Sequence, residues 1–106
     1  AVVRGVLELV ERDATAIWWY NRVRRPALDP RALGWTKMAE HIEAFADGRS
    51  TTLLDITTDL GIAVCAAIGA DGSGGDLTLG FGAAFGREQA AWKALAELAQ
   101  ITHAWA

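Results

Sequence analysis

The sequence contains few cysteines and histidines, the residues that form disulfides and structural zinc sites. Its single cysteine, Cys65, leaves no partner for a disulfide within the chain. With only two histidines, His41 and His103, a closed zinc site of cysteine and histidine ligands is also disfavoured. Any metal must then be a hard ion held by carboxylates. Cys65 itself lies in an apolar run, which favours an inert core residue over a nucleophile.

Long apolar stretches and a secretory leader are missing as well. The longest apolar runs, Ile62–Ile68 and Ala16–Tyr20, fall far below the ~18–20 residues that a transmembrane helix requires. No basic and apolar segment opens the chain. We therefore expect no membrane partner and a cytoplasmic location.

A positive charge balance is also missing, since 10 basic and 13 acidic residues give a net charge of −3. This balance argues against a nucleic-acid partner, despite a local basic group at Arg22, Arg24 and Arg25. With 52% hydrophobic and 22% charged residues, the composition is that of a globular domain and not of a disordered chain. A length of 106 residues allows one domain.

Helical spacing of apolar residues predicts three helices. The first runs from Val2 to about Arg22 and ends before the prolines, the second and weaker one covers Trp35–Ala46 and is closed by Asp47-Gly48, and the last covers Arg87 to about Trp105. The apolar stripe of the first consists of Val3, Val6, Leu7, Val10, Ala14 and Ile17, and that of the last of Ala91, Ala94, Leu98 and Ile101.

Between the second and third helices the period changes to that of strands. Three strands are predicted, at Thr51–Thr58, Ile62–Ile68 and Leu77–Gly82, and the short first connection favours antiparallel pairing. Gly80 and Gly82 leave room for another backbone or a ligand to approach. The predicted fold is α+β: a three-stranded antiparallel sheet packed with two long helices and one shorter helix.

Glu8 and Glu11 are the first candidates for chemistry. With Arg4 and Thr15 they share one face of the first helix, bordering its apolar stripe. If both carboxylates turn toward one point ~5 Å apart in a partly buried cleft, their repulsion is on the order of 3 kcal/mol, which a bound cation would offset. The alternative is that they point into water and form surface pairs with Arg4 and Arg12.

The last helix carries a second candidate set, Lys93, Glu97 and Gln100, on one narrow face beside small residues. Lys93 and Glu97 have the spacing of an ordinary i,i+4 ion pair, so a solvated face is the alternative. The aromatic block Trp18-Trp19-Tyr20 is typical of core or interface packing. Gly80-Phe81-Gly82 lacks the remaining residues of a phosphate-binding loop.

Taken together, several segments resemble the ATP-binding motif region of YcaO-domain proteins, and in particular the cyclodehydratases that make thiazole- and oxazole-modified peptides. Order and spacing agree over nearly all 106 residues. The segments that carry the resemblance are Glu8–Ala14, Trp18–Arg22, Arg25-Pro26, Asp55–Ile62, Gly80–Ala83 and Ala90–Gln100.

In the first helix, the family motif Ser-x-x-Glu-x-x-Glu-Arg is matched by Glu8, Glu11 and Arg12, whereas Gly5 stands in place of the serine. The resemblance implies that Glu8 and Glu11 bind Mg²⁺ and the phosphates of ATP, with Arg12 close to the same site.

In the last helix, the resemblance implies that Glu97 is a nucleotide-site glutamate and metal ligand and that Gln100 is its companion. Ala90 and Lys93 replace a serine and an asparagine found in some members. These departures alter individual contacts to the nucleotide.

The implied activity is ATP- and Mg²⁺-dependent activation of peptide backbone amides, which forms azolines from Cys, Ser or Thr in ribosomal peptide natural products such as bacteriocins. The implied partners are a peptide substrate and a substrate-recognition protein. Complete YcaO domains are several times longer, so residues 1–106 are expected to be the central ATP-motif part, without its flanking segments and without turnover by itself. The first helix begins at Ala1 with no capping residue, which also suggests excision from a longer protein.

A different class of function is open to the same sequence. A catalytically inert piece of such a domain would expose apolar faces that its neighbours once covered, and these faces favour self-association. In that reading the chain is a protein-interaction module, and a homo-oligomer is expected.

Overall fold

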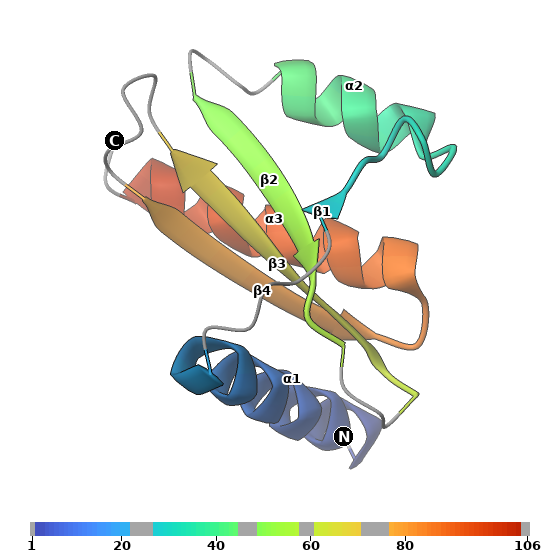
Figure 1. Ribbon diagram of the computed structural model, residues 1–106, viewed down its shortest axis with the longest axis vertical. Helices are drawn as coiled ribbons and strands as arrows, with labels where there is room; N and C mark the ends of the chain where they lie inside the picture. The colour runs from blue at the N-terminus through green and yellow to red at the C-terminus, as the bar shows by residue number, and fades with distance from the viewer. Residues whose placement is uncertain (1, 22–26, 45–48, 58–60, 71–76, 105–106) are drawn as a thin grey trace.

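The computed structural model describes residues 2–21, 27–44, 49–57, 61–70 and 77–104, with side chains from 4 to 16 in the first helix and up to 101 in the last. The aromatic block Trp18-Trp19-Tyr20 and the predicted helix end at Asp47-Gly48 lie outside the described side chains and residues. The elements are α1 (Val2–Asn21), β1 (Ala27–Leu28), α2 (Thr36–Ala44), β2 (Ser50–Asp55), β3 (Ala63–Ala70), β4 (Thr78–Ala84) and α3 (Arg87–Ala104) (Figure 1).

The predicted α+β class with two long helices and one shorter helix is confirmed, and the helices have 20, 9 and 18 residues. The predicted strand number is wrong, because the sheet has four strands and not three. The additional strand, β1, consists of Ala27 and Leu28, which pair with Leu54 and Leu53 of β2. Two residues between prolines give no periodic signal, so only the pairing defines this strand.

The sheet is an antiparallel meander in which strand order follows sequence order, β1-β2-β3-β4. Strand β2 ends at Asp55, before the predicted end at Thr58, because side chains take over the hydrogen bonding. The Thr57 N–H donates to Asp55 Oδ1 at 3.0 Å, and the Thr57 hydroxyl accepts from the Val64 N–H at 3.0 Å. Gly61, with φ +73°, then turns the chain into β3.

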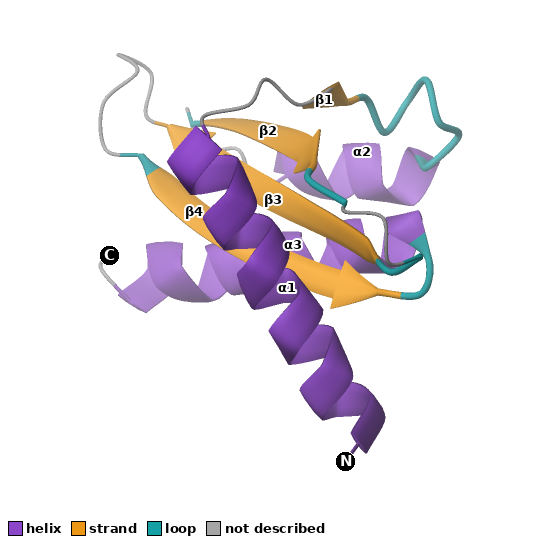
Figure 2. Ribbon diagram, turned by 60° about the horizontal axis from the view of Figure 1, so that its bottom comes forward, coloured by secondary structure: helices purple, strands orange, loops and turns teal. Residues whose placement is uncertain are grey.

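The helices cover both faces of the sheet. Figure 2 shows α1 crossing one face while α2 and α3 lie behind the other. The face toward α2 and α3 is packed by Met38, Leu53, Cys65, Ala67, Ala84, Ala90, Ala91, Ala94, Leu95 and Leu98. The face toward α1 is packed by Val10, Ala14, Ile56, Ile62, Val64, Ala66 and Ala83. Alternate residues of β3 therefore enter opposite cores, as the period of a strand requires.

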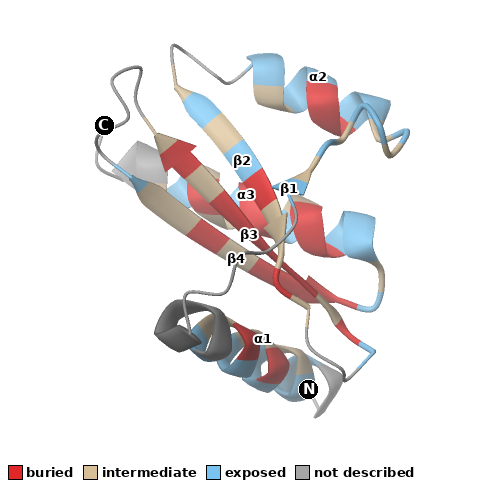
Figure 3. Ribbon diagram, in the orientation of Figure 1, coloured by how far each residue is buried: buried red, intermediate tan, exposed pale blue. Residues whose placement is uncertain are grey.

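Helix α3 lies close against β4 because two glycines of that strand have no side chain. A Cβ atom at Gly80 would lie 2.5 Å from the Ala94 carbonyl oxygen, and one at Gly82 would lie 2.4 Å from the Ala90 carbonyl oxygen. The predicted close approach is thus confirmed, and the approaching group is the backbone of α3. Figure 3 shows the resulting band of buried residues along β3, β4 and α3.

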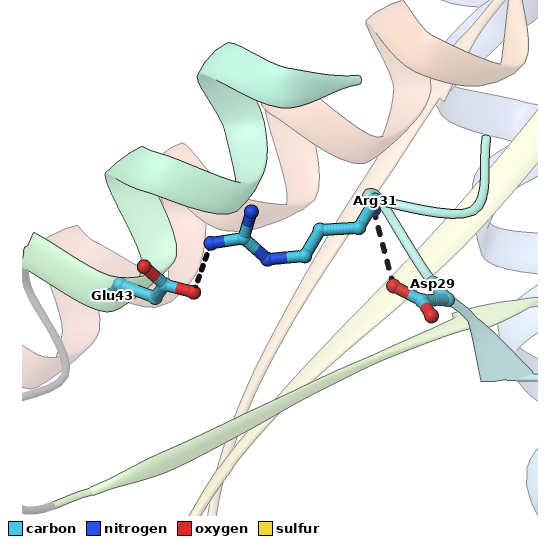
Figure 4. Close-up of polar contacts among 3 residues, drawn as sticks. All are labelled: Asp29, Arg31 and Glu43. Atoms are coloured by element: carbon cyan, nitrogen blue, oxygen red, sulfur yellow. Dashed lines mark hydrogen bonds and ion pairs between the residues drawn. The ribbon is translucent and has the colours of Figure 1, made fainter. Parts of the chain in front are cut away.

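The segment before α2 is held by polar contacts at the surface. Trp35 lies just outside the helix that it was predicted to begin, and its carbonyl accepts the Ala39 N–H at 3.1 Å. Arg31 bonds through its own N–H to Asp29 Oδ1 at 3.1 Å and forms an ion pair with Glu43 of α2 (Figure 4). The hydrogen bond and the charge of Glu43 raise the pKa of the Arg31 guanidinium.

Within the described residues, no helix combines the length and apolarity needed to cross a membrane.

Candidate functional site

A hollow of about 480 Å³ lies where α1 crosses β4. Five of its lining residues come from α1 and one from β4: Glu8, Glu11, Arg12, Thr15, Ala16 and Phe81. Val10 and Ala14 of α1 pack on the sheet. The neighbouring face of the helix carries the polar residues, lies at the edge of this contact and forms the wall of the hollow. Three of the predicted site residues, Glu8, Glu11 and Arg12, therefore lie together.

The surroundings of Glu11 shift the pKa of its carboxyl. Burial raises the pKa of its carboxyl above the ordinary value, and the negative charges of Glu97 and Glu8 raise this pKa further. The positive charge of Lys93 acts in the opposite direction. Glu97 and Lys93 belong to α3, on the other side of the sheet from α1. The pKa of Glu11 therefore depends on charges from both helices. The sequence predicts the two acidic sets separately, and the fold brings them within electrostatic reach of each other.

Glu8 and Arg12 are exposed parts of the same wall. Glu8 forms the predicted i,i+4 pair with Arg4, with 3.5 Å between Nε and Oε1. The Arg4 and Glu8 side chains are 85% and 67% exposed, so solvent screens the pair and leaves the Glu8 carboxylate able to exchange partners.

On α3, Glu97 is half-buried and Gln100 is exposed. The predicted ion pair between Lys93 and Glu97 is not formed within the described residues. Lys93 Nζ instead donates to the carbonyl oxygen of Ala83 in β4, at 3.1 Å. The reason is the closeness of α3 to β4, which places this backbone acceptor within reach of the lysine.

The carboxylates suit Mg²⁺ in kind but do not form a finished cage. Among the residues that the structure describes, no three His, Cys, Asp or Glu side chains gather closely enough to hold a metal ion. Mg²⁺ is often bound by one or two carboxylates, with substrate phosphates and water supplying the other ligands. Glu11 fits that arrangement, because a cation would offset both its burial and its repulsion by Glu97 and Glu8.

Phe81 and Thr15 are lining residues that sequence reasoning did not assign to a site. Phe81 stands between Gly80 and Gly82, and alternation along β4 turns it away from α3 and toward α1. The two glycines face one helix, so the residue between them must face the other side of the sheet. This spacing is the signal that could have identified it.

Cys65 plays no part in the hollow. It is fully buried in the core beneath α3, as predicted. Burial, with a smaller contribution from Asp55, raises the pKa of its thiol to about 12, while Arg87 acts against this shift. The thiol is therefore protonated at neutral pH and is a poor nucleophile.

Comparison with known proteins gives a family match over nearly the whole chain. The family model described as YcaO cyclodehydratase, ATP- and Mg²⁺-binding, matches residues 1–105. An uncharacterized protein of Methanothermobacter thermautotrophicus is 34% identical in a match 104 residues long that covers 94% of this chain and 27% of that protein. The chain thus spans about a quarter of the length of this relative.

Two solved structures share the fold. The heterocyclase TruD is 36% identical with a TM-score of 0.78, covering 98% of this chain and 16% of TruD. A heterocyclase in complex with substrate and cofactor is 38% identical with a TM-score of 0.84, covering 92% of this chain and 13% of that protein. Both likenesses cover more than nine-tenths of this chain.

Proposed function

The chain belongs to the YcaO family, and on that premise we propose that it forms the central, acidic part of the nucleotide site in an ATP- and Mg²⁺-dependent cyclodehydratase. The likeness to two heterocyclases supports a cyclodehydratase-type role. The observation that carries the proposal is Glu11, a half-buried carboxylate on the wall of a hollow, acted on by Glu8 and Glu97. Such a concentration of negative charge is suited to a cation that bridges to phosphates.

In this proposal each predicted residue has a separate task. Glu11 is the central Mg²⁺ ligand because it is the less solvated of the two glutamates on the wall of the hollow, and Glu8 or Glu97 adds a second carboxylate while phosphates and water complete the coordination. Arg12 lines the hollow beside Glu11 and offers a guanidinium to phosphate oxygens. Gln100, one turn beyond Glu97 on α3, adds a neutral polar contact.

The proposed reaction closes a ring in a peptide substrate that a recognition protein delivers. A Cys, Ser or Thr side chain attacks the preceding backbone carbonyl and loses its proton, and the resulting oxyanion takes the γ-phosphoryl group of ATP. Phosphate then leaves with the carbonyl oxygen while the amide nitrogen loses its proton, which forms the C=N bond of the azoline. When bound, Mg-ATP would supply the phosphoryl group, and its Mg²⁺ would neutralise part of the phosphate charge. The residues of this chain contribute by binding and orienting the phosphates, so their catalytic effect is positional and electrostatic.

Titration with Mg-ATP tests the site. We expect the wild-type chain to bind, Glu11→Gln to weaken binding about tenfold or more, and Glu8→Gln to weaken it less, since Glu8 is exposed. Glu88→Gln, an exposed glutamate in the first turn of α3, is the matched control and should bind like the wild type. Identical binding by all four proteins would remove the assignment of the site.

A second experiment tests whether residues 1–106 are one part of the catalytic unit. The chain covers 13–16% of the two heterocyclases, so we propose that it does not turn over by itself. Single-turnover assays with Mg-ATP should release no phosphate above the buffer rate. Stoichiometric release would show that the catalytic unit is complete.

The alternative, a self-associating interaction module, draws support from exposed apolar side chains. Leu9 of α1 and Phe85 after β4 are 63% and 67% exposed, and the amino-terminal part of α1 projects past β4 (Figure 2). If this is the function, sedimentation at increasing concentration should give a dimer that Leu9→Lys dissociates. A wild-type chain that dimerises and binds no Mg-ATP would favour this alternative.

A further inference from the structure

Lys93 belongs to α3, and its side chain reaches across to β4, at the border of the acidic site. Its Cβ would lie 2.5 Å from a Cβ at Gly82, so its side chain starts where α3 touches β4. From there the side chain reaches the Ala83 carbonyl oxygen, 3.1 Å from Nζ. A residue other than glycine at position 82 would occupy the path that the lysine takes.

The register shows why this carbonyl is free to accept. Ala83 pairs with Val64 of β3. The backbone N–H and carbonyl of Val64 point away from β4, toward the segment that follows β2. The Val64 carbonyl accepts the Ile56 N–H at 2.9 Å, and the Val64 N–H donates to the Thr57 hydroxyl at 3.0 Å. Ala83 and Val64 are therefore a non-hydrogen-bonded pair, and the Ala83 carbonyl points to the outer edge of β4. Among the described strands, β4 has no neighbour on that side.

Ala83, which accepts the Lys93 hydrogen bond, also lies next to α1, the helix that carries Glu8 and Glu11. The Ala83 side chain packs with Val10 and Ala14, on either side of Glu11 along that helix. The Lys93 charge acts on Glu11 against those of Glu97 and Glu8. The hydrogen bond to the Ala83 carbonyl thus places one ammonium within electrostatic reach of Glu11.

We propose that Lys93 is a positioning residue of the site, whose ammonium acts as a resident cation and takes the place of one divalent ion. This proposal rests on the proposed function in that it treats the carboxylates of the site as metal ligands. A fixed positive charge offsets part of the carboxylate repulsion and also repels an incoming divalent cation. The chain should therefore hold Mg²⁺ more weakly than it would with a neutral residue at position 93.

Binding of Mn²⁺ alone, followed by the electron paramagnetic resonance of the free ion at neutral pH, tests this proposal on the 106-residue chain without nucleotide. We expect Lys93→Asn to bind Mn²⁺ about tenfold more tightly than the wild type, and Lys93→Arg, which keeps the charge, to match the wild type. Lys37→Asn removes an exposed lysine from α2 and is the control for net charge. It should leave the affinity unchanged.

Lys93→Gln covers the case in which the asparagine variant fails to fold, because its longer amide can still donate to Ala83. A purely structural lysine would change the melting temperature of both variants and leave Mn²⁺ binding as in the wild type. Equal affinity in the wild type and in whichever neutral variants fold, including no binding in any of them, would overturn the proposal. So would an equal gain in Lys37→Asn.

The outcome separates this inference from the function on which it rests. Tighter Mn²⁺ binding by Lys93→Asn together with no Mg-ATP binding by any form would support the resident cation and refute the nucleotide site. Loss of Mg-ATP binding in Glu11→Gln, with Mn²⁺ affinity unaffected by Lys93→Asn, would support the nucleotide site and refute the resident cation.

Discussion

The two faces of the sheet are packed differently. Toward α3, the alanines at 90, 91 and 94 are fully buried, and Gly80 and Gly82 bring the helix backbone directly onto β4. Toward α1, Val10 and Ala14 are buried, but Leu9 and Val6 are 63% and 45% exposed, and a hollow with acidic walls opens beside the strand. The α3 face is a close-packed scaffold, whereas the α1 face gives up packing to keep charged groups near the sheet.

The largest expected effect comes from breaking the tight face. Gly82→Ala would place a Cβ within 2.4–2.6 Å of the Ala90 oxygen, the Lys93 Cβ and the Ala94 nitrogen, which belong mostly to backbone and cannot move aside. We expect a loss of about 3 kcal/mol in the free energy of unfolding, measured by urea denaturation. Gly5→Ala, in α1 with nothing within 4 Å, should instead gain about 0.5–1 kcal/mol. Equal effects at the two glycines would contradict the comparison.

A moderate effect is expected at the centre of the α1 face. Val10 is 6% exposed, so Val10→Ala removes two buried methyl groups and should cost about 1–2 kcal/mol. Leu9→Ala, on the exposed side of the same helix, should stay within about 0.5 kcal/mol of the wild type. Thermal denaturation of both variants checks this difference, and a larger loss at Leu9 would mean that α1 is covered on its outer side in solution.

The smallest effect is expected at Glu11 and depends on pH. Burial and neighbouring glutamates raise its pKa in the folded state, so the folded protein binds a proton more tightly than the unfolded chain. Stability linked to this group is therefore present at low pH and is lost as pH rises through the raised folded pKa.

Glu11→Gln mimics the protonated form and should stabilise the fold at pH 7 by a few tenths of a kcal/mol, the scale of solvent-screened interactions. The gain should vanish below the ordinary carboxyl pKa, where both proteins are neutral at this position. Melting curves of the wild type and Glu11→Gln from pH 4 to pH 8 give the comparison. A gain independent of pH would assign the effect to packing.

Most of the fold could be predicted from local patterns. Helical spacing locates α1 and α3, since α1 buries Val10 and Ala14 and α3 buries its alanines and leucines at helical intervals, although Val6 of the predicted α1 stripe is 45% exposed. Runs of β-branched and small apolar residues locate β2, β3 and β4. Strand β1 could not be predicted, because Ala27 and Leu28 are a strand only through their pairing with β2.

The candidate site was less predictable because it joins segments far apart in the chain. Glu8, Glu11 and Arg12 could be grouped from helical geometry alone. The influence of Glu97 on Glu11 depends on how two helices on opposite faces approach one edge of the sheet, and helical spacing contains no such information. For the same reason, spacing predicted that Lys93 would pair with Glu97, whereas the proximity of α3 to β4 directs it to a backbone carbonyl.

The meander has a consequence for how the chain folds. Each strand pairs with the strand next to it in sequence, and α3 follows directly on β4. The β2–β3 and β3–β4 hairpins can therefore close over short loops at little entropic cost, whereas α2 lies between β1 and β2. Helix α1 can dock only once β3 and β4 stand side by side, since it packs on both. The hollow between α1 and β4 can therefore form only after the part of the sheet that supports α1.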